Sequence, residues 1–209
     1  MRLTTSSFDD GGVIGDRYAF ARPDPVSKVT FSGNVNPSLT WDGVPDGTRS
    51  FAIICHDPDV PSRPDDVNVE GREVPTDLPR VDFFHWVVID LPGDIRSIDE
   101  GEFSDGVVPG GKGASEGPHG CRQGLNDYCG WFAGDPDMGG TYRGYDGPAP
   151  PWNDSIVHRY VFTVHALDVD RLPLAEAFTG QDVLDAIDGR VLASASVTGT
   201  YTQNTRLRE

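Results

Sequence analysis

The chain has 209 residues, of which 37% are hydrophobic and 10% aromatic, enough apolar material for the core of a single domain spanning residues 1–209. Its 17 Lys and Arg against 33 Asp and Glu give a net charge of −16, which opposes binding to nucleic acids and to anionic lipid surfaces. No apolar run reaches the roughly 18–20 residues of a membrane helix, and Met1–Asp10 lacks the apolar segment of a secretory signal. We therefore expect a cytoplasmic protein with no nucleic-acid partner and no integral membrane association.

The acidic and basic residues are of unusual kinds. The chain has 26 Asp but 7 Glu, and 15 Arg but only 2 Lys. A surface of short, strongly hydrated carboxylates is typical of proteins adapted to high salt, where mobile ions screen the repulsion between them. This composition predicts a halophilic surface and a stability that rises with added salt.

The spacing of Gly and Pro along the chain, 25 and 17 residues respectively, favours short strands joined by turns over long helices. Two short apolar runs near the start, Thr30–Phe31 and Leu39–Trp41, suggest a weak hairpin. Ser50–Cys55 is almost wholly apolar and predicts a strand buried on both faces, ended by the Pro-containing turn Asp57–Pro61. Three further strands are expected at Phe83–Leu91, His158–Leu167 and Val191–Tyr201.

Two other segments complete the expected architecture. The stretch 101–152 is rich in Gly, Asp and Pro and shows no periodicity, but its Tyr and Trp residues favour a long ordered loop. Thr179 to Asp182 resembles a capping box, and the apolar residues that follow it predict a short helix stopped at Gly189. The elements together predict a β-dominated sandwich with a late helix and a large ordered loop.

Four polar side chains are expected near strand ends. His158 and Tyr160 are two residues apart on one strand and therefore face the same side of a sheet. His85 begins the apolar part of another strand, and Asp57 follows a third. If they converge, the two imidazoles and the phenol would donate hydrogen bonds to a small anion, and the carboxylate would orient one of the histidines.

A rigid segment precedes His158 by a few residues. Gly144–Pro151 contains three prolines in its last four residues, so it forms neither a helix nor a regular strand. We expect this segment to form one wall of a binding pocket.

The order of these motifs resembles one known family. The motifs are Asp57-Pro58-Asp59-Val60-Pro61, Phe84-His85-Trp86, Gly147-Pro148-Ala149-Pro150-Pro151 and His158-Arg159-Tyr160. In this order they resemble the phosphatidylethanolamine-binding protein family, and most closely its bacterial and archaeal branch, often labelled Raf kinase inhibitor-like. Arg122 to Tyr128, Gly134 to Met138 and Gly199-Thr200-Tyr201 match that branch as well, so that the resemblance spans roughly Phe51 to Tyr201.

The resemblance implies an all-β-dominated fold, a two-sheet antiparallel β-sandwich with one or two short C-terminal helices and a long ordered loop. It also implies a cavity at one end that takes phosphate, acetate or the head group of phosphatidylethanolamine. Carried over by motif position, the ligand-binding residues would be Asp57, Pro61, His85, Gly147, Pro148, Pro150, His158 and Tyr160.

The chain departs from shorter relatives at two places. The segment between Ser62 and Asp82 is an insertion, and Trp131 to Tyr142 is a second expansion. Both lie in sequence beside the motif segments, so we expect them to narrow or cover the pocket.

Three functions stay open. The first is a non-catalytic module, without a cofactor, that binds a small anion or a phosphate-bearing head group and has a regulatory role. The second is a protein-interaction regulator that inhibits a kinase or peptidase, with an unknown protein partner. The third is a metal-dependent enzyme that uses Asp57, His85 and His158 as a metal-binding triad. A homodimer is compatible with all three.

Two chemical expectations follow, one for anion binding and one for the cysteines. If the anion binds charged imidazole, affinity should rise as the pH falls through the usual histidine range near 6.5. The three cysteines lack a Cys-x-x-Cys spacing; Cys121 and Cys129 could pair, but reduced thiols are favoured.

Overall fold

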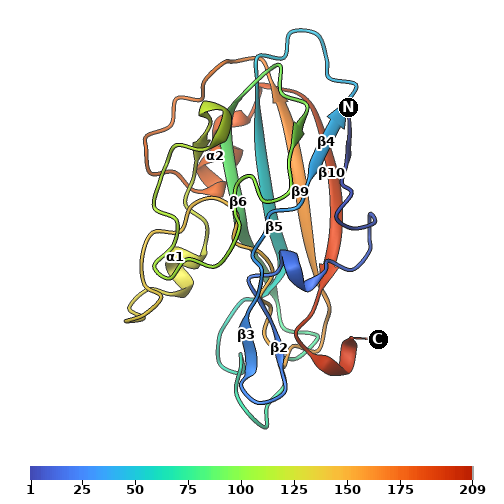
Figure 1. Cartoon of the computed structure of the whole chain (residues 1–209), viewed down its shortest axis with the longest axis vertical. Helices are drawn as coiled ribbons and strands as arrows, with labels where there is room; N and C mark the ends of the chain where they lie inside the picture. The colour runs from blue at the N-terminus through green and yellow to red at the C-terminus, as the bar shows by residue number, and fades with distance from the viewer. Residues whose placement is uncertain (209) are drawn as a thin grey trace.

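A computed structural model describes residues 1–208. Its largest sheet has five antiparallel strands in the order β10–β9–β5–β6–β8, which run along the length of the molecule in Figure 1. These strands are β5 (Ser50–Pro61), β6 (Arg80–Pro92), β8 (Arg122–Gln123), β9 (His158–Leu167) and β10 (Val191–Tyr201). The four long strands include every apolar run for which the sequence predicts a major strand.

Five short strands outside the five-stranded sheet were harder to place from sequence. A three-stranded sheet has the order β1–β4–β7, and β2 pairs with β3 in a separate ribbon that projects at one end of the molecule (Figure 1). The bounds are β1 (Arg2–Thr4), β2 (Ala21–Asp24), β3 (Lys28–Phe31), β4 (Leu39–Asp42) and β7 (Ser97–Ile98).

The hairpin predicted between Thr30–Phe31 and Leu39–Trp41 is wrong. The first run belongs to β3, which pairs with β2, and the second belongs to β4, which pairs with β1 and β7. The segment between them cannot fold as a turn because its backbone is bonded elsewhere: the amides of Asn34 and Asn36 donate to the carbonyls of Ala19 and Ser104. The chain therefore crosses from one sheet to another.

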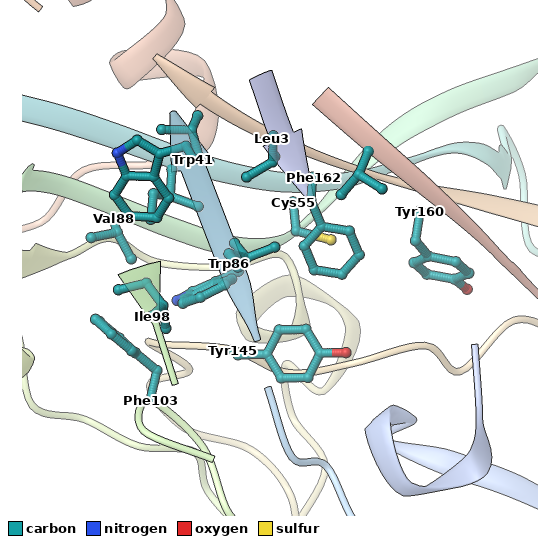
Figure 2. Packing of buried hydrophobic residues seen from close by; sticks show 14 of the residues in the cluster. Leu3, Trp41, Cys55, Trp86, Val88, Ile98, Phe103, Tyr145, Tyr160 and Phe162 are labelled. Atoms are coloured by element: carbon teal, nitrogen blue, oxygen red, sulfur yellow. The ribbon is translucent and has the colours of Figure 1, made fainter. Parts of the chain in front are cut away.

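The core confirms that β5 is buried on both faces. One side of β5 faces the three-stranded sheet, where Trp41, Trp86 and Phe162 pack together (Figure 2). The other side packs, through Ile54, against α2 and the segment before it. The two sheets and the layer between them are the antiparallel β-sandwich that the motifs implied.

The helices are short. The predicted helix is α2 (Gly180–Ile187), and its capping box is present, because Thr179 and Asp182 each accept a hydrogen bond from the other's backbone amide. The loop 101–152 is ordered and carries β8 and a helix that the sequence did not predict, α1 (Tyr128–Trp131). Single 3-10 turns lie at Asp16–Tyr18, Pro118–Gly120 and Thr205–Leu207.

The end of the five-stranded sheet opens at Asp57. The strand β5 does not stop there, as the sequence suggested, but continues along β6 to Pro61 with register shifts that accommodate its prolines. Its pairing with β9 ends at His56 and Val161. Because the pairing of β5 with β9 ends at this point, the sheet opens there, and a cavity lined by residues of both strands lies at the opening.

Within residues 1–208, no helix combines the length and the apolar character that crossing a membrane requires.

Candidate functional site

A cavity of about 380 Å³ lies where β5 and β9 separate. Four parts of the chain surround it: the β2–β3 ribbon, the insertion after Pro61, α1, and the Pro-rich loop before β9. Its outer walls are apolar or aromatic and are formed largely by Phe20, Phe31, Val60, Val67, Phe83, Trp131, Phe132 and Pro151. The polar side chains of Asp57, His85, His158 and Tyr160 form its floor. A polar floor with apolar walls is the usual form of a small-molecule site.

The structure brings most of the motif residues to this cavity. Those that line it are Asp57, Pro61, His85, Pro150, His158 and Tyr160. They come from β5, β6, β9 and the Pro-rich loop, so four segments distant in sequence share one floor. Gly147 and Pro148 do not line the cavity.

Gly147 and Pro148 hold the Pro-rich wall in place. The amide of Gly147 donates to Asn34 Oδ1 at 2.8 Å, and its carbonyl accepts from the Tyr128 hydroxyl at 2.8 Å. A Cβ at Gly147 would collide with the carbonyl oxygen of Tyr18, so this close approach requires glycine. The carbonyl of Pro148 accepts from the amide of Phe20 at 2.9 Å. Both residues therefore position the wall without lining the cavity.

His158 is enclosed between two carboxylates. Its Nδ1 lies 2.8 Å from Asp57 Oδ2 and its Nε2 lies 3.0 Å from Asp154 Oδ2, with the side chain wholly buried. Burial alone would lower the pKa of His158, but the charge of Asp57 and the hydrogen bonds to both carboxylates outweigh burial and raise the pKa to about 9. The ring is therefore a buried cation at neutral pH.

This geometry corrects the donor role expected for His158. Both ring nitrogens are already bonded, so the ring has no hydrogen left to donate to an anion. Asp57 does contact a histidine, as expected, but its other oxygen accepts from the amide of Asp59 at 2.8 Å. His158 and Asp57 form an internal ion pair that shapes the floor of the cavity.

His85 has one nitrogen free. Its Nδ1 lies 2.7 Å from the backbone oxygen of Asp146, and since a carbonyl only accepts, Nδ1 carries the hydrogen. The ring packs between Phe83, Tyr128 and Tyr160, with centroids 4.9–5.5 Å away. Burial lowers its pKa to about 4, although the charge of Asp57 opposes this shift. At neutral pH the ring is uncharged, and Nε2 is a hydrogen-bond acceptor.

Neither imidazole therefore titrates near 6.5. With pKa values of about 4 for His85 and about 9 for His158, the His85 ring stays neutral and the His158 ring stays cationic between pH 5 and 8. The expectation that imidazole protonation strengthens anion binding in this range is wrong for these two rings.

The Tyr160 hydroxyl is buried, and no acceptor within the described residues forms a well-aligned hydrogen bond with it; the carboxylate of Asp57 is the acceptor beside it. Burial raises its pKa well above the usual value, and the carboxylate of Asp57 adds to the shift. Tyr160 lies at the edge of the core cluster in Figure 2, with its oxygen directed away from the other labelled side chains. It is a neutral donor placed at the cavity.

Sequence reasoning missed Asp154 and Arg80. Arg80 donates to both oxygens of Asp154, at 2.6 and 3.1 Å, and so extends the ion-pair chain that begins at Asp57. Burial would raise the pKa of Asp154, but the hydrogen bonds from His158 and Arg80 outweigh it and lower the pKa. The available signal was a second carboxylate four residues before His158, close enough along the chain to reach its ring.

The insertion after Pro61 and the expansion after Trp131 both reach the cavity, as expected. Asn153, which is 4% exposed, anchors the insertion, because its side-chain amide donates to the carbonyls of Asp66 and Arg72. From the insertion, Arg63 lines the rim of the cavity, and its side chain is 68% exposed. The insertion thus narrows the entrance without adding charge to the floor.

The metal-binding alternative finds no support in the side-chain geometry. Among residues 1–208 no three His, Cys, Asp or Glu side chains are arranged to hold a metal ion. In the expected triad the nitrogens of His158 are occupied by carboxylates. Cys121 and Cys129 are free thiols in the structure, as is Cys55.

A family model described as phosphatidylethanolamine-binding protein matches residues 4–202. The chain belongs to this family. It is 34% identical to UPF0098 protein YbhB of Escherichia coli, over 96% of this chain and 99% of YbhB. It is 36% identical to a UPF0098 protein of Methanothermobacter thermautotrophicus, over 96% of this chain and 98% of that protein.

Among solved structures, the fold is similar to that of YbcL from Escherichia coli, described as a new member of the mammalian family of these proteins. The TM-score is 0.67 at 26% identity, covering 96% of this chain and 97% of YbcL. A family homologue from Chlamydia trachomatis gives a TM-score of 0.61 at 28% identity, covering 96% of this chain and 95% of that chain. Membership in the phosphatidylethanolamine-binding protein family thus agrees with the sandwich and with the motifs at its open end.

Proposed function

We propose that this protein binds a small oxyanion or a phosphorylated head group at the floor of the cavity, without chemical turnover, and that it acts as a regulatory binding protein. The observation that carries this proposal is the buried, unpartnered hydroxyl of Tyr160 together with Nε2 of His85, which makes no hydrogen bond within the described residues; both residues line one cavity. Buried polar groups in folded proteins are nearly always hydrogen-bonded. A ligand that bonds to both atoms would remove the cost of leaving the Tyr160 hydroxyl unsatisfied and would give Nε2 of His85 a hydrogen-bond donor.

The size and walls of the cavity support a ligand larger than the anion alone. A phosphate group has five heavy atoms and would fill only part of about 380 Å³. Aromatic side chains such as Phe31 and Trp131 surround the remaining space. We infer that the oxyanion occupies the floor and that an apolar substituent lies against these walls.

The protonation states favour binding over catalysis. His158 has no free lone pair and therefore cannot act as a general base. Burial raises the pKa of the Cys55 thiol well above its usual value, so the thiol is a poor nucleophile. The groups at the floor are suited to hold a ligand rather than to transform one.

Tyr160→Phe tests the proposal, because it should separate stability from binding. Removing an unsatisfied buried hydroxyl should leave the free energy of unfolding unchanged or raise it by about 1 kcal/mol. The affinity for phosphoethanolamine should fall roughly tenfold, since the ligand loses a hydrogen bond. Thermal unfolding and calorimetric titration measure the two effects.

Tyr145→Phe is the matched control. The hydroxyl of Tyr145 is satisfied, because it donates to the carbonyl of Tyr18 at 2.7 Å, and Tyr145 does not line the cavity. This change should lower stability by about 1 kcal/mol and leave the affinity unaltered. A Tyr160→Phe variant that binds phosphoethanolamine as tightly as the wild type would overturn the proposed site.

A further inference from the structure

The floor of the cavity has an unusual balance of charge for an anion site. Asp57 and Asp154 are balanced by His158 and Arg80, and both the His158 ring and the Arg80 guanidinium are bonded to these carboxylates. Of the lining residues within 1–208, only Arg63 is permanently cationic, and it lies at the exposed rim. The floor therefore holds no free cation that would attract a fully ionised oxyanion.

The free atoms at the floor also differ from those of an ordinary anion site. The Tyr160 hydroxyl can donate, but Nε2 of His85 can only accept, because the hydrogen of the neutral ring is on Nδ1 and is committed to the Asp146 carbonyl. An oxyanion without a proton would place its lone pairs against the lone pair of Nε2. An oxyanion that carries one proton would instead donate that proton to Nε2.

We propose that the cavity selects oxyanions that carry a proton, so that a phosphomonoester binds as its monoanion and a sulfate ester of the same shape and charge is rejected. The inference rests on the proposed function and names the ligand class of the same site. In the complex, the ligand P–O–H donates to Nε2 of His85, and Tyr160 donates to a second phosphate oxygen. A phosphomonoester that is a dianion in solution takes up one proton as it binds.

The surroundings of His85 keep Nε2 an acceptor. The titratable groups that face the ring come from every element packed against it: Asp57 of β5, His158 and Tyr160 of β9, Tyr128 of α1, and Asp146 of the Pro-rich loop. Burial disfavours a charged ring most strongly, and the cation at His158 adds to that effect. Asp57 and the bond to Asp146 oppose it but do not outweigh burial.

Asp57, the single carboxylate among the lining residues within 1–208, reinforces the selection. The Asp57 carboxylate lines the floor, and although it is paired with His158, a dianion placed beside it would meet no second cation. When the ligand dianion takes up a proton, its repulsion from Asp57 falls, and the new P–O–H group is the donor that Nε2 of His85 lacks. Sites that bond to a ligand hydrogen reject analogues without it, because the buried acceptor is then left unpaired.

Methyl phosphate and methyl sulfate form the decisive pair of probes. Both are monoanions of similar shape at pH 5, and they differ by one proton. We expect methyl phosphate to bind at least about tenfold more tightly at pH 5. Above its second pKa of about 6, its affinity should fall roughly tenfold per pH unit, because the monoanion becomes scarce. Methyl sulfate should bind weakly and without change from pH 5 to 8. NMR titration measures these affinities.

A substitution at the acceptor tests its role. His85→Gln places an amide near the position of Nε2, and the amide can turn to donate or to accept. The variant should bind the two probes within about threefold of each other, chiefly because methyl sulfate gains a donor. His165→Gln is the matched control: His165 bonds to Ser194 on β10 and does not line the cavity, so the preference should be kept.

The outcomes separate this inference from the proposed function. If wild-type protein binds both probes equally at pH 5, or binds methyl phosphate with constant affinity from pH 6 to 8, the selection is wrong and the anion site stands. If neither probe shifts any resonance of cavity residues, both the selection and the proposed anion site are wrong.

Discussion

Replacing His158 with leucine should lower the free energy of unfolding by about 3–5 kcal/mol, which is the usual cost of removing one partner from a buried ion pair. The substitution leaves Asp57 without its counter-charge, and Asp154 keeps only Arg80. For a chain of this length, the melting temperature should fall by roughly 10 °C. Urea and thermal unfolding of the two proteins measure the loss.

The same comparison should depend on pH. The folded pKa of His158 is about 9, above the unfolded value of about 6.5. The folded state therefore binds the proton more tightly, and the stabilisation is complete below pH 6.5 and is lost as the pH rises through 9. The gap between wild type and His158→Leu should narrow from pH 6.5 to 9.

His165→Leu is the control for this experiment. Burial lowers the pKa of His165 to about 4, so its ring is neutral across the same range. Its stability difference from wild type should be small and should stay constant from pH 6.5 to 9. A gap for His158→Leu that is equally constant would show that His158 is not the buried cation described above.

Added salt should stabilise the protein strongly. In 1 M KCl the Debye length is about 3 Å, against about 30 Å in dilute buffer, so the repulsion within a chain of net charge −16 is largely screened. Salt also weakens ion pairs, and 12 of the 17 Lys and Arg side chains form such pairs within the described residues. Exposed pairs contribute only about 0–1 kcal/mol each. Screening of the excess acids should therefore win, and the melting temperature should rise by on the order of 10 °C.

The pH provides the control for the salt effect. Near the isoelectric point, about 4.5, the net charge approaches zero and the repulsion that salt screens is absent. The gain in melting temperature between dilute buffer and 1 M KCl should then disappear or reverse. Equal melting temperatures in the two buffers at pH 7 would contradict the interpretation of the acidic composition as salt adaptation.

Local patterns in the sequence predicted the long strands and part of the site. The two-residue spacing of His158 and Tyr160 placed both on one face of β9, and both line the cavity. The capping residues Thr179 and Asp182 located α2. These features depend on residues close together in the sequence, so a local sequence pattern is enough to predict them.

Features that depend on contacts between distant parts of the chain could not be predicted from the sequence. The strand β4 pairs with β1, near the start of the chain, and with β7, more than 50 residues further on, and no turn signal in the sequence identifies either partner. The role of His158 depends on Asp154 reaching its second nitrogen, and the acceptor state of His85 depends on one carbonyl of a loop. The motifs identified which residues gather, and only the geometry shows which atoms remain free.

A crystal structure of the protein with phosphoethanolamine tests the central claim most directly. Its phosphate should lie on the cavity floor, with oxygens about 2.7–3.2 Å from Nε2 of His85 and from the Tyr160 hydroxyl. The His158 ring should keep both of its carboxylate contacts. A phosphate held at the rim by Arg63, or located outside the cavity, with the floor atoms still unpaired, would contradict the account.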